Sequence, residues 1–266
     1  MTGWGQDGPW AAMAGHDIDY IALTGMLHAV GREGGPPVPP LNLIGDFGGG
    51  GMLLALGMLA ALLRARETGE GQVVDAAMVD GASVLGSFVW GLAAGGGWTT
   101  KRGTNLLDTG APVYDVDETS DGGHMAVGAL EPQFFAALLE RLDLPAEMAS
   151  TQWDRDAWPR LRQTLEAKFG SRSRDEWAAH FAGSDACVAP VLTYEEAPDH
   201  PHLAARGTFT EVGGVVQPAP APRFSATPTD TPTPPVVAGA QTDAILTELG
   251  YAPAEIESLR GSGVIG

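Results

Sequence analysis

The segment Gly45–Arg66, which reads GDFGGGGMLLALGMLAALLRAR, decides how this chain folds. Its second part, from Met52 onward, is rich in Leu, Ala and Met and predicts a helix that stops near Gly69. Asp46 is a residue type that caps such helices well. Four consecutive glycines lower the stability of a helix start, so we expect the bare backbone to be required there. Close approach of a ligand to backbone amides is one such requirement.

The glycine run does not match two common phosphate-binding motifs. No Gly-Lys-Ser/Thr follows it, as a phosphate-binding loop would require. Its glycines are contiguous, so it meets the spaced dinucleotide-binding fingerprint only trivially. The pattern therefore indicates a binding turn of another kind, or a plain helix cap.

Hydrophobic periodicity outlines the rest of the chain. Extended runs are predicted at residues 41–44, 71–78 and 124–129. Helices are predicted in the glycine-rich stretch 81–100, after Glu131-Pro132 with an apolar stripe, and at about 156–169, 174–182, 242–249 and 253–259. Seven prolines between residues 218 and 235 predict an extended connector.

The charge distribution restricts the partners of the chain. The net charge is −18, and residues 1–105 carry nine acidic and five basic side chains while residues 106–266 carry twenty-four and ten. Such a chain repels phosphate backbones, so we expect no nucleic-acid binding. The uncharged stretches 47–63 and 81–100 are short or glycine-rich, so we expect no membrane insertion. Cys187 is the single cysteine and is expected to be a buried thiol in a cytoplasmic protein.

A second polar feature, Gly15-His16-Asp17-Ile18-Asp19-Tyr20, precedes the glycine run. An isolated histidine is most often structural, but His16 is flanked by Gly and Asp between apolar segments. The pair in His200-Pro201-His202 has no further His or Cys nearby, so it predicts a surface loop and no metal site.

Several long motifs together resemble the acyl-CoA racemases of the family III CoA-transferase superfamily. They are Thr2–Pro9 (TGWGQDGP), Gly15–Tyr20 (GHDIDY), Pro40–Gly50 (PLNLIGDFGGG), Arg66–Met78 (RETGEGQVVDAAM), Val127–Phe135 (VGALEPQFF) and Gln241–Tyr251 (QTDAILTELGY). The resemblance extends over essentially the whole chain. It implies interconversion of (2R)- and (2S)-2-methylacyl-CoA thioesters, a step in lipid and fatty acid metabolism.

The resemblance assigns roles to individual residues. It implies two-base 1,1-proton transfer through an enolate, with His16 and Asp46 on opposite faces of the α-carbon. Glu131 would hydrogen-bond the catalytic histidine. Residues expected to bind the thioester are Asp17, Tyr20, Gly45 and Gly48. No metal or other cofactor is implied.

The same superfamily offers a competing chemistry, in which Asp46 is the nucleophile of a CoA-transferase. The presence of His16 favours the racemase. A third hypothesis is an inactive truncated homologue that only dimerises.

The fold class implied is α/β. We expect an N-terminally truncated large domain of the family III CoA-transferase type at residues 1–105, because the Rossmann-like half that normally precedes this motif and binds much of the CoA is missing. A smaller α+β domain is expected at 106–215, and a proline-rich connector returning to the large domain at 216–266. The resemblance also implies an interlocked homodimer, with Glu131 supplied by either chain.

Overall fold

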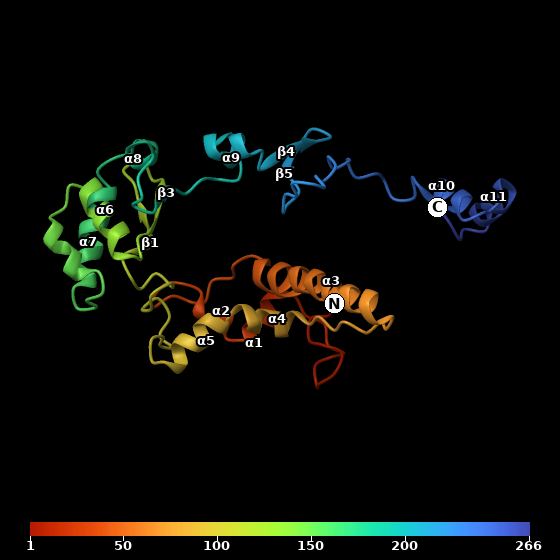
Figure 1. The fold of residues 1–266 in the computed structure, drawn as a ribbon, viewed down its shortest axis with the longest axis horizontal. Coiled ribbons are helices and arrows are strands. Elements are labelled where there is room, and N and C mark those ends of the chain that lie inside the picture. Colours follow the sequence, from red (N-terminus) through yellow and green to blue (C-terminus); the bar gives the residue numbers. More distant parts are fainter. The chain divides into compact units, whose positions relative to one another are not determined.

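The computed structural model describes all 266 residues, which divide into two compact units, Met1–Val191 and Leu192–Gly266. The predicted segments 1–105 and most of 106–215 fall within the first unit, and the boundaries between them stay a prediction. The first unit contains helices α1 (Asp17–Leu23), α2 (Met26–Ala29), α3 (Leu53–Thr68), α4 (Met78–Leu85), α5 (Ser87–Ala94), α6 (Pro132–Arg141), α7 (Trp158–Phe169) and α8 (Arg174–Phe181), the π-helix η1 (Leu43–Met52), the 3₁₀ helix η2 (Ala146–Thr151) and strands β1 (Tyr114–Glu118), β2 (His124–Gly128) and β3 (Val188–Pro190) (Figure 1).

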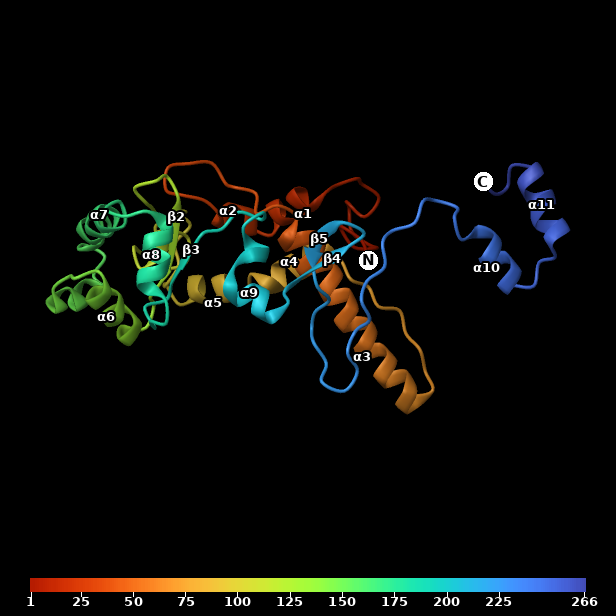
Figure 2. The same cartoon turned by 90° about the horizontal axis from the view of Figure 1, so that it is seen from above.

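The helix predicted after the glycine run is confirmed as α3, which Figure 2 shows as one uninterrupted rod. It ends at Gly69, whose φ of 78° is the left-handed conformation that commonly terminates helices. Ahead of α3, the glycine run itself is helical and forms η1. A π-helix is rare and is found mostly at functional sites, so η1 is a candidate part of a functional site.

The glycine run is explained by close helix packing. A Cβ on Gly81 in α4 would lie 1.9 Å from the carbonyl oxygen of Gly49, and a Cβ on Gly49 would lie 2.6 Å from the nitrogen of Ala82. Only glycine permits backbones to approach so closely. Close packing against α4 therefore explains why glycine is needed at position 49, and the approach of a ligand to the other glycines of η1 stays a prediction.

Two of the predicted extended runs do not form strands. Residues 41–44 form no buried strand: Leu41 is 76% exposed with φ of 57°, and Leu43 begins η1. Residues 71–77 are extended but form only an isolated parallel bridge, from Thr2 to Ala77. A strand requires a neighbouring strand for its backbone hydrogen bonds. The segment at Thr2 pairs with residues 71–77 through a single bridge only, so no strand forms there.

The three-stranded sheet has the order β1-β2-β3 and is antiparallel throughout. Helices α6, α7 and α8 pack against one face of the sheet (Figures 1 and 2). Met125 and Val127 of β2 point into the main hydrophobic core. This core also contains Phe135 of α6, Leu161 of α7 and Trp177 of α8. The predicted strand at 124–129, the helix after Glu131 and the helices near 156–169 and 174–182 are thus confirmed as β2, α6, α7 and α8.

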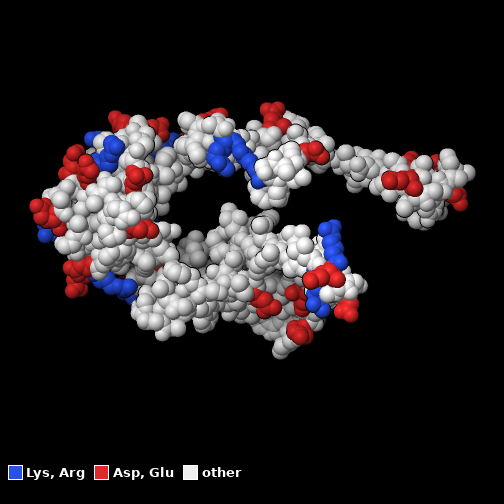
Figure 3. All heavy atoms as spheres, in the orientation of Figure 1, with Lys and Arg blue, Asp and Glu red and all other residues white.

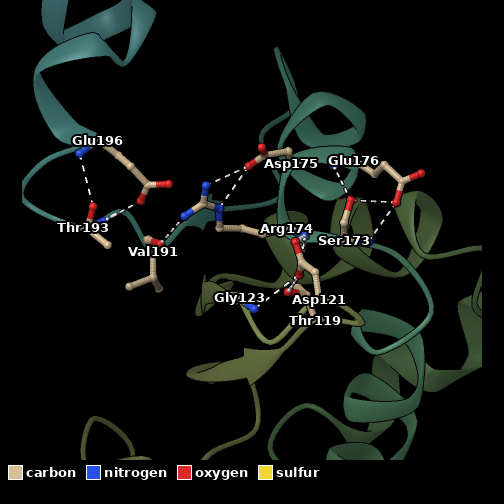
Figure 4. A network of polar contacts seen from close by, with 10 residues as sticks. All are labelled: Thr119, Asp121, Gly123, Ser173, Arg174, Asp175, Glu176, Val191, Thr193 and Glu196. Carbon is tan, nitrogen blue, oxygen red and sulfur yellow. Dashed lines mark hydrogen bonds and ion pairs between the residues drawn. The ribbon is translucent and has the colours of Figure 1, made fainter.

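The turn between β1 and β2 is fastened to the start of α8. The Asp121 carboxylate accepts hydrogen bonds from the Thr119 hydroxyl and from the backbone N–H groups of Gly123 and Arg174 (Figure 4). These hydrogen bonds hold the pKa of Asp121 below its usual range. Ser173 caps α8 by accepting from the Glu176 N–H.

The second unit contains η3 (Ala197–Asp199), α9 (Pro201–Arg206), the hairpin of β4 (Phe209–Val212) and β5 (Val215–Pro218), α10 (Thr242–Glu248) and α11 (Pro253–Gly261). No helix or strand lies between Pro218 and Thr242, which confirms the proline-rich connector. The two predicted C-terminal helices are confirmed as α10 and α11.

Two further expectations need correction. Cys187 is exposed, with φ of 53°, because the chain turns there into β3 and leaves the thiol outside the core. The apolar helical segment is also longer than expected: Leu43–Thr68 runs for 26 residues and contains an 18-residue window with a mean hydropathy of 1.6. By length and composition alone it could cross a membrane, but a single such helix is a weak indication, since helices of soluble proteins pass the same test.

Candidate active site

His16 directly precedes the first turn of α1. Its backbone N–H donates to Asp19 Oδ2 at 3.0 Å, which satisfies one of the amide groups that a helix start leaves unpaired. Its side chain is exposed, and no carboxylate lies within ion-pair distance of the imidazole. The ring is therefore open to a bound molecule.

Asp17 connects α1 to the glycine run. Its Oδ2 accepts hydrogen bonds from the backbone N–H of Gly45 at 2.6 Å and of Asp46 at 2.7 Å. The residue is only 4% exposed. Because His16 is its sequence neighbour, this one carboxylate ties the two predicted catalytic residues to the same place in the fold.

Asp46 is half-buried in η1, and Asn42 Nδ2 donates to its Oδ2 at 3.1 Å. Tyr20 lies close enough to Asp46 for the charge of that carboxylate to affect the pKa of the phenol. Burial, together with the charges of Asp46 and Asp19, raises the pKa of Tyr20 above its ordinary value. The phenol donates to the Gly15 carbonyl oxygen at 2.5 Å. The structure thus brings together His16, Asp17, Tyr20, Gly45 and Asp46.

The Tyr20 ring is enclosed by the N-terminal loop. Trp4 packs edge-on against it, with ring centroids 4.7 Å apart. A Cβ on Gly3 would lie 2.1 Å from the ring, so glycine is required at this contact. Trp4 and Tyr20 therefore form an aromatic side of the site.

Gly48 and Glu131 occupy other surroundings. Gly48 faces α4, and a Cβ there would lie 2.9 Å from Leu85. Glu131 directly precedes α6 and is exposed. No hydrogen bond or ion pair joins Glu131 to His16 within the chain, and Glu131 lies close enough to Cys187 for its charge to raise the pKa of that thiol, after burial as the larger cause. The roles predicted for Gly48 and Glu131 stay predictions.

The basic side chains of residues 1–105 are mostly committed to protein groups. Arg32 pairs with Asp115 at 2.9 Å, Lys101 pairs with Glu33, and Arg102 donates to backbone carbonyls. Arg64 lies 3.8 Å from Glu70. Figure 3 shows little charge over α5, in keeping with the uncharged stretch 81–100. These residues form no cluster of free cations of the kind that a polyphosphate would need.

Sequence reasoning missed two residues of this site. Asn42, four positions before Asp46, supplies the side-chain amide that holds the Asp46 carboxylate. Asp19, three positions after His16, caps the histidine backbone. The spacing of three residues between Asp19 and the residue that precedes the helix is the signal of a capping box and could have identified it.

The mixed α/β fold carries an exposed His16 and a half-buried Asp46, linked through Asp17 beside the glycine-rich helix η1, which defines a candidate site for acid–base chemistry. Comparison with known proteins gives the family. A family model described as CoA-transferase family III matches residues 1–242. The chain belongs to this family.

Individual relatives agree with the assignment. The chain is 43% identical over 268 residues to a protein of Mus musculus named alpha-methylacyl-CoA racemase, and 42% identical to the protein of that name from Homo sapiens. Each alignment covers all of this chain and 70% of the relative. A CAIB/BAIF family protein from Brucella suis has the same fold, with a TM-score of 0.73 at 24% identity, over 93% of this chain and 66% of the other.

Proposed function

We propose that this protein is an acyl-CoA racemase that interconverts the (2R) and (2S) forms of 2-methylacyl-CoA thioesters. The observation that carries the proposal is the hydrogen bonding of Asp17. This residue follows His16 in the sequence, and its carboxylate accepts hydrogen bonds from the backbone N–H groups of Gly45 and Asp46. This contact supports a shared site for His16 and Asp46, two groups that can move a proton. The relatives named alpha-methylacyl-CoA racemase support the substrate class.

The reaction needs one base and one acid on opposite faces of C2. The base removes the C2 proton, and the electrons of the C–H bond delocalise into the thioester as an enolate. The acid then delivers a proton to the other face, so one proton is lost and one is gained. An imidazole and a carboxyl group can each take either part, which makes the reaction reversible. This step uses no cofactor.

In this assignment His16 serves one face of C2 and Asp46 serves the other. Tyr20 and Gly48 stay proposed contacts for the thioester, and Glu131, from the same chain or from a partner in a homodimer, would orient the His16 imidazole. The N–H groups of Gly45 and Asp46 already donate to Asp17. The enolate oxygen therefore needs other donors.

Membership of CoA-transferase family III supports a second candidate function. Asp46 Oδ2 accepts from Asn42, while Oδ1 has no hydrogen bond to the protein. In a transferase, a carboxylate oxygen of Asp46 would attack the thioester carbonyl carbon and expel the CoA thiolate, leaving a mixed anhydride. Such a reaction does not require His16.

Incubation of the protein with each 2-methylacyl-CoA enantiomer in deuterated water tests the proposal. We expect deuterium at C2 together with racemisation. The His16→Ala and Asp46→Asn variants should each abolish exchange from one enantiomer, and Asp80→Asn, at an exposed position of α4, should leave it unchanged. Acyl transfer to an added carboxylate without C2 exchange would establish the transferase, and a folded protein that does neither would be a binding-only homologue.

A further inference from the structure

We propose that Asp17 is a positioning residue that fixes Asp46 relative to His16, and that its side chain does not touch the substrate. This inference rests on the proposed racemase function and assigns Asp17 a role different from the thioester contact implied by the family resemblance.

The first argument is enclosure. Asp17 Oδ2 is fully occupied by the two N–H groups of Gly45 and Asp46, at 2.6 and 2.7 Å. The other oxygen, Oδ1, is buried and has no hydrogen-bond partner. A carboxylate with one oxygen bonded to the backbone and the other out of contact with solvent presents no face to a substrate.

The second argument is the strength of the contact. The two N–H groups donate to Oδ2 at 2.6 and 2.7 Å, at the short end of the range for N–H···O hydrogen bonds. Burying a carboxylate is costly unless such bonds compensate for the lost water. A solvated aspartate could cap α1 without this cost, so a buried one at this position is best explained by what it holds in place.

The third argument is that Asp17 connects the two predicted catalytic residues. Asp17 is joined to His16 by one peptide bond and to Asp46 by a hydrogen bond to the Asp46 backbone. Loss of the Asp17 carboxylate therefore removes the contact that holds the Asp46 backbone next to the residue that follows His16. A misplacement of about 1 Å in an active site can cost on the order of 100-fold in rate.

The experiment compares Asp17→Ala, Asp17→Asn and Asp17→Glu with Asp80→Asn as a matched aspartate control. Deuterium exchange at C2 is measured from each enantiomer, together with KM. The direction that depends on Asp46 is identified as the one that Asp46→Asn abolishes. Amide hydrogen exchange of residues 43–48 is followed in the same proteins without substrate.

We expect Asp17→Ala to slow the Asp46-dependent direction about 10- to 100-fold, to slow the other direction less, and to leave KM within about threefold. The N–H groups of Gly45 and Asp46 should lose protection. Asp17→Asn keeps an oxygen acceptor and should restore most of both properties. If Asp17→Ala does not fold, Asp17→Glu retains the charge but displaces the oxygens, and it should show the same asymmetry.

A rise in KM with equal loss from both enantiomers would overturn the inference in favour of a substrate contact. Equal losses with unchanged amide protection would overturn it as well. The amide measurement does not depend on turnover. If the wild-type protein shows no C2 exchange, the proposed function fails, whereas unchanged protection in a folded Asp17→Ala protein defeats the positioning role itself.

Discussion

Gly49 of η1 and Gly81 of α4 cross backbone to backbone: a Cβ on Gly81 would lie 1.9 Å from the Gly49 carbonyl oxygen and 2.6 Å from its Cα. The contact sets the distance between the helix that carries Asp46 and the helix behind it. No rotamer change can relieve a clash with backbone atoms, so the two helices would have to separate.

We therefore predict that Gly81→Ala destabilises the protein by about 1–3 kcal/mol or more, as overpacked cores do. The clash outweighs the roughly 1 kcal/mol by which alanine favours a helix over glycine. Urea denaturation measures the change. Gly91→Ala in α5 is the matched control, because a Cβ there meets no atom within 4 Å, and it should be neutral or stabilising. Equal behaviour of the two variants would contradict the packing argument.

Asp115 connects the loop at Arg32 to helix α7. Its carboxylate, with a side chain only 2% exposed, binds the guanidinium groups of Arg32 and Arg162. Asp115→Ala leaves two guanidinium groups that water partly reaches, since the Arg32 side chain is 59% exposed and that of Arg162 is 29% exposed, so it should cost about 1–3 kcal/mol of unfolding free energy. Asp243→Ala breaks the exposed pair with Arg260 and should cost less than about 1 kcal/mol. A small effect at Asp115 would mean that water already screens the cluster.

Asp117 gives the protein a distinct dependence on pH. Burial, with the neighbouring charge of Asp115, raises its pKa from 3.8 to about 7, while Arg162 and Arg32 lower it and Glu166 raises it. The folded state therefore holds a proton that the unfolded chain releases near pH 4. Because the native state binds more protons in this range, this contribution to stability is complete below pH 4 and is lost as pH rises to about 7.

In Asp117→Asn this dependence should disappear. The difference in unfolding free energy between variant and wild type should shift in favour of the variant between pH 4 and pH 8, by at most about 4 kcal/mol, since one pKa unit corresponds to about 1.4 kcal/mol. Urea denaturation at several pH values measures it. Glu118→Gln, on the exposed face of the same strand, should show no such shift. Parallel curves for Asp117→Asn and wild type would refute the assignment.

The sequence predicted the elements whose own pattern determines them. Helix α6 carries its apolar stripe in order, and Phe135, Leu138 and Leu139 are buried as expected. Strand β1 was missed because its burial pattern is reversed: Asp115 and Asp117 face inward while Val116 is exposed. The distant Arg32 and Arg162 hold the Asp115 carboxylate there, and no local pattern predicts these partners.

For the candidate site, the motifs identified His16 and Asp46, but the geometry between them depends on partners far along the chain. The hydrogen bonds from Gly45 and Asp46 to Asp17 span 28 and 29 residues. The glycine run predicts a binding turn or a helix cap, but its contact with Gly81, more than 30 residues away, cannot be read from a local pattern. Residue types fix the available chemistry, whereas tertiary contacts decide which backbone groups remain free to perform it.

Gly45 offers the most direct test of the tie between Asp17 and the glycine run. A Cβ on Gly45 would lie 2.8 Å from Asp17 Oδ2, so Gly45→Ala should push the carboxylate away from the amides that it holds. Gly51→Ala is the matched control in the same helix, because its Cβ would meet only the Asp46 carbonyl oxygen at an ordinary 3.5 Å. We predict that Gly45→Ala lowers C2 proton exchange about 10- to 100-fold and exposes the amides of residues 45–46 to hydrogen exchange, while Gly51→Ala retains both. Full exchange activity in a folded Gly45→Ala protein would show that the Asp46 backbone tolerates displacement, and the positioning role of Asp17 would then be wrong.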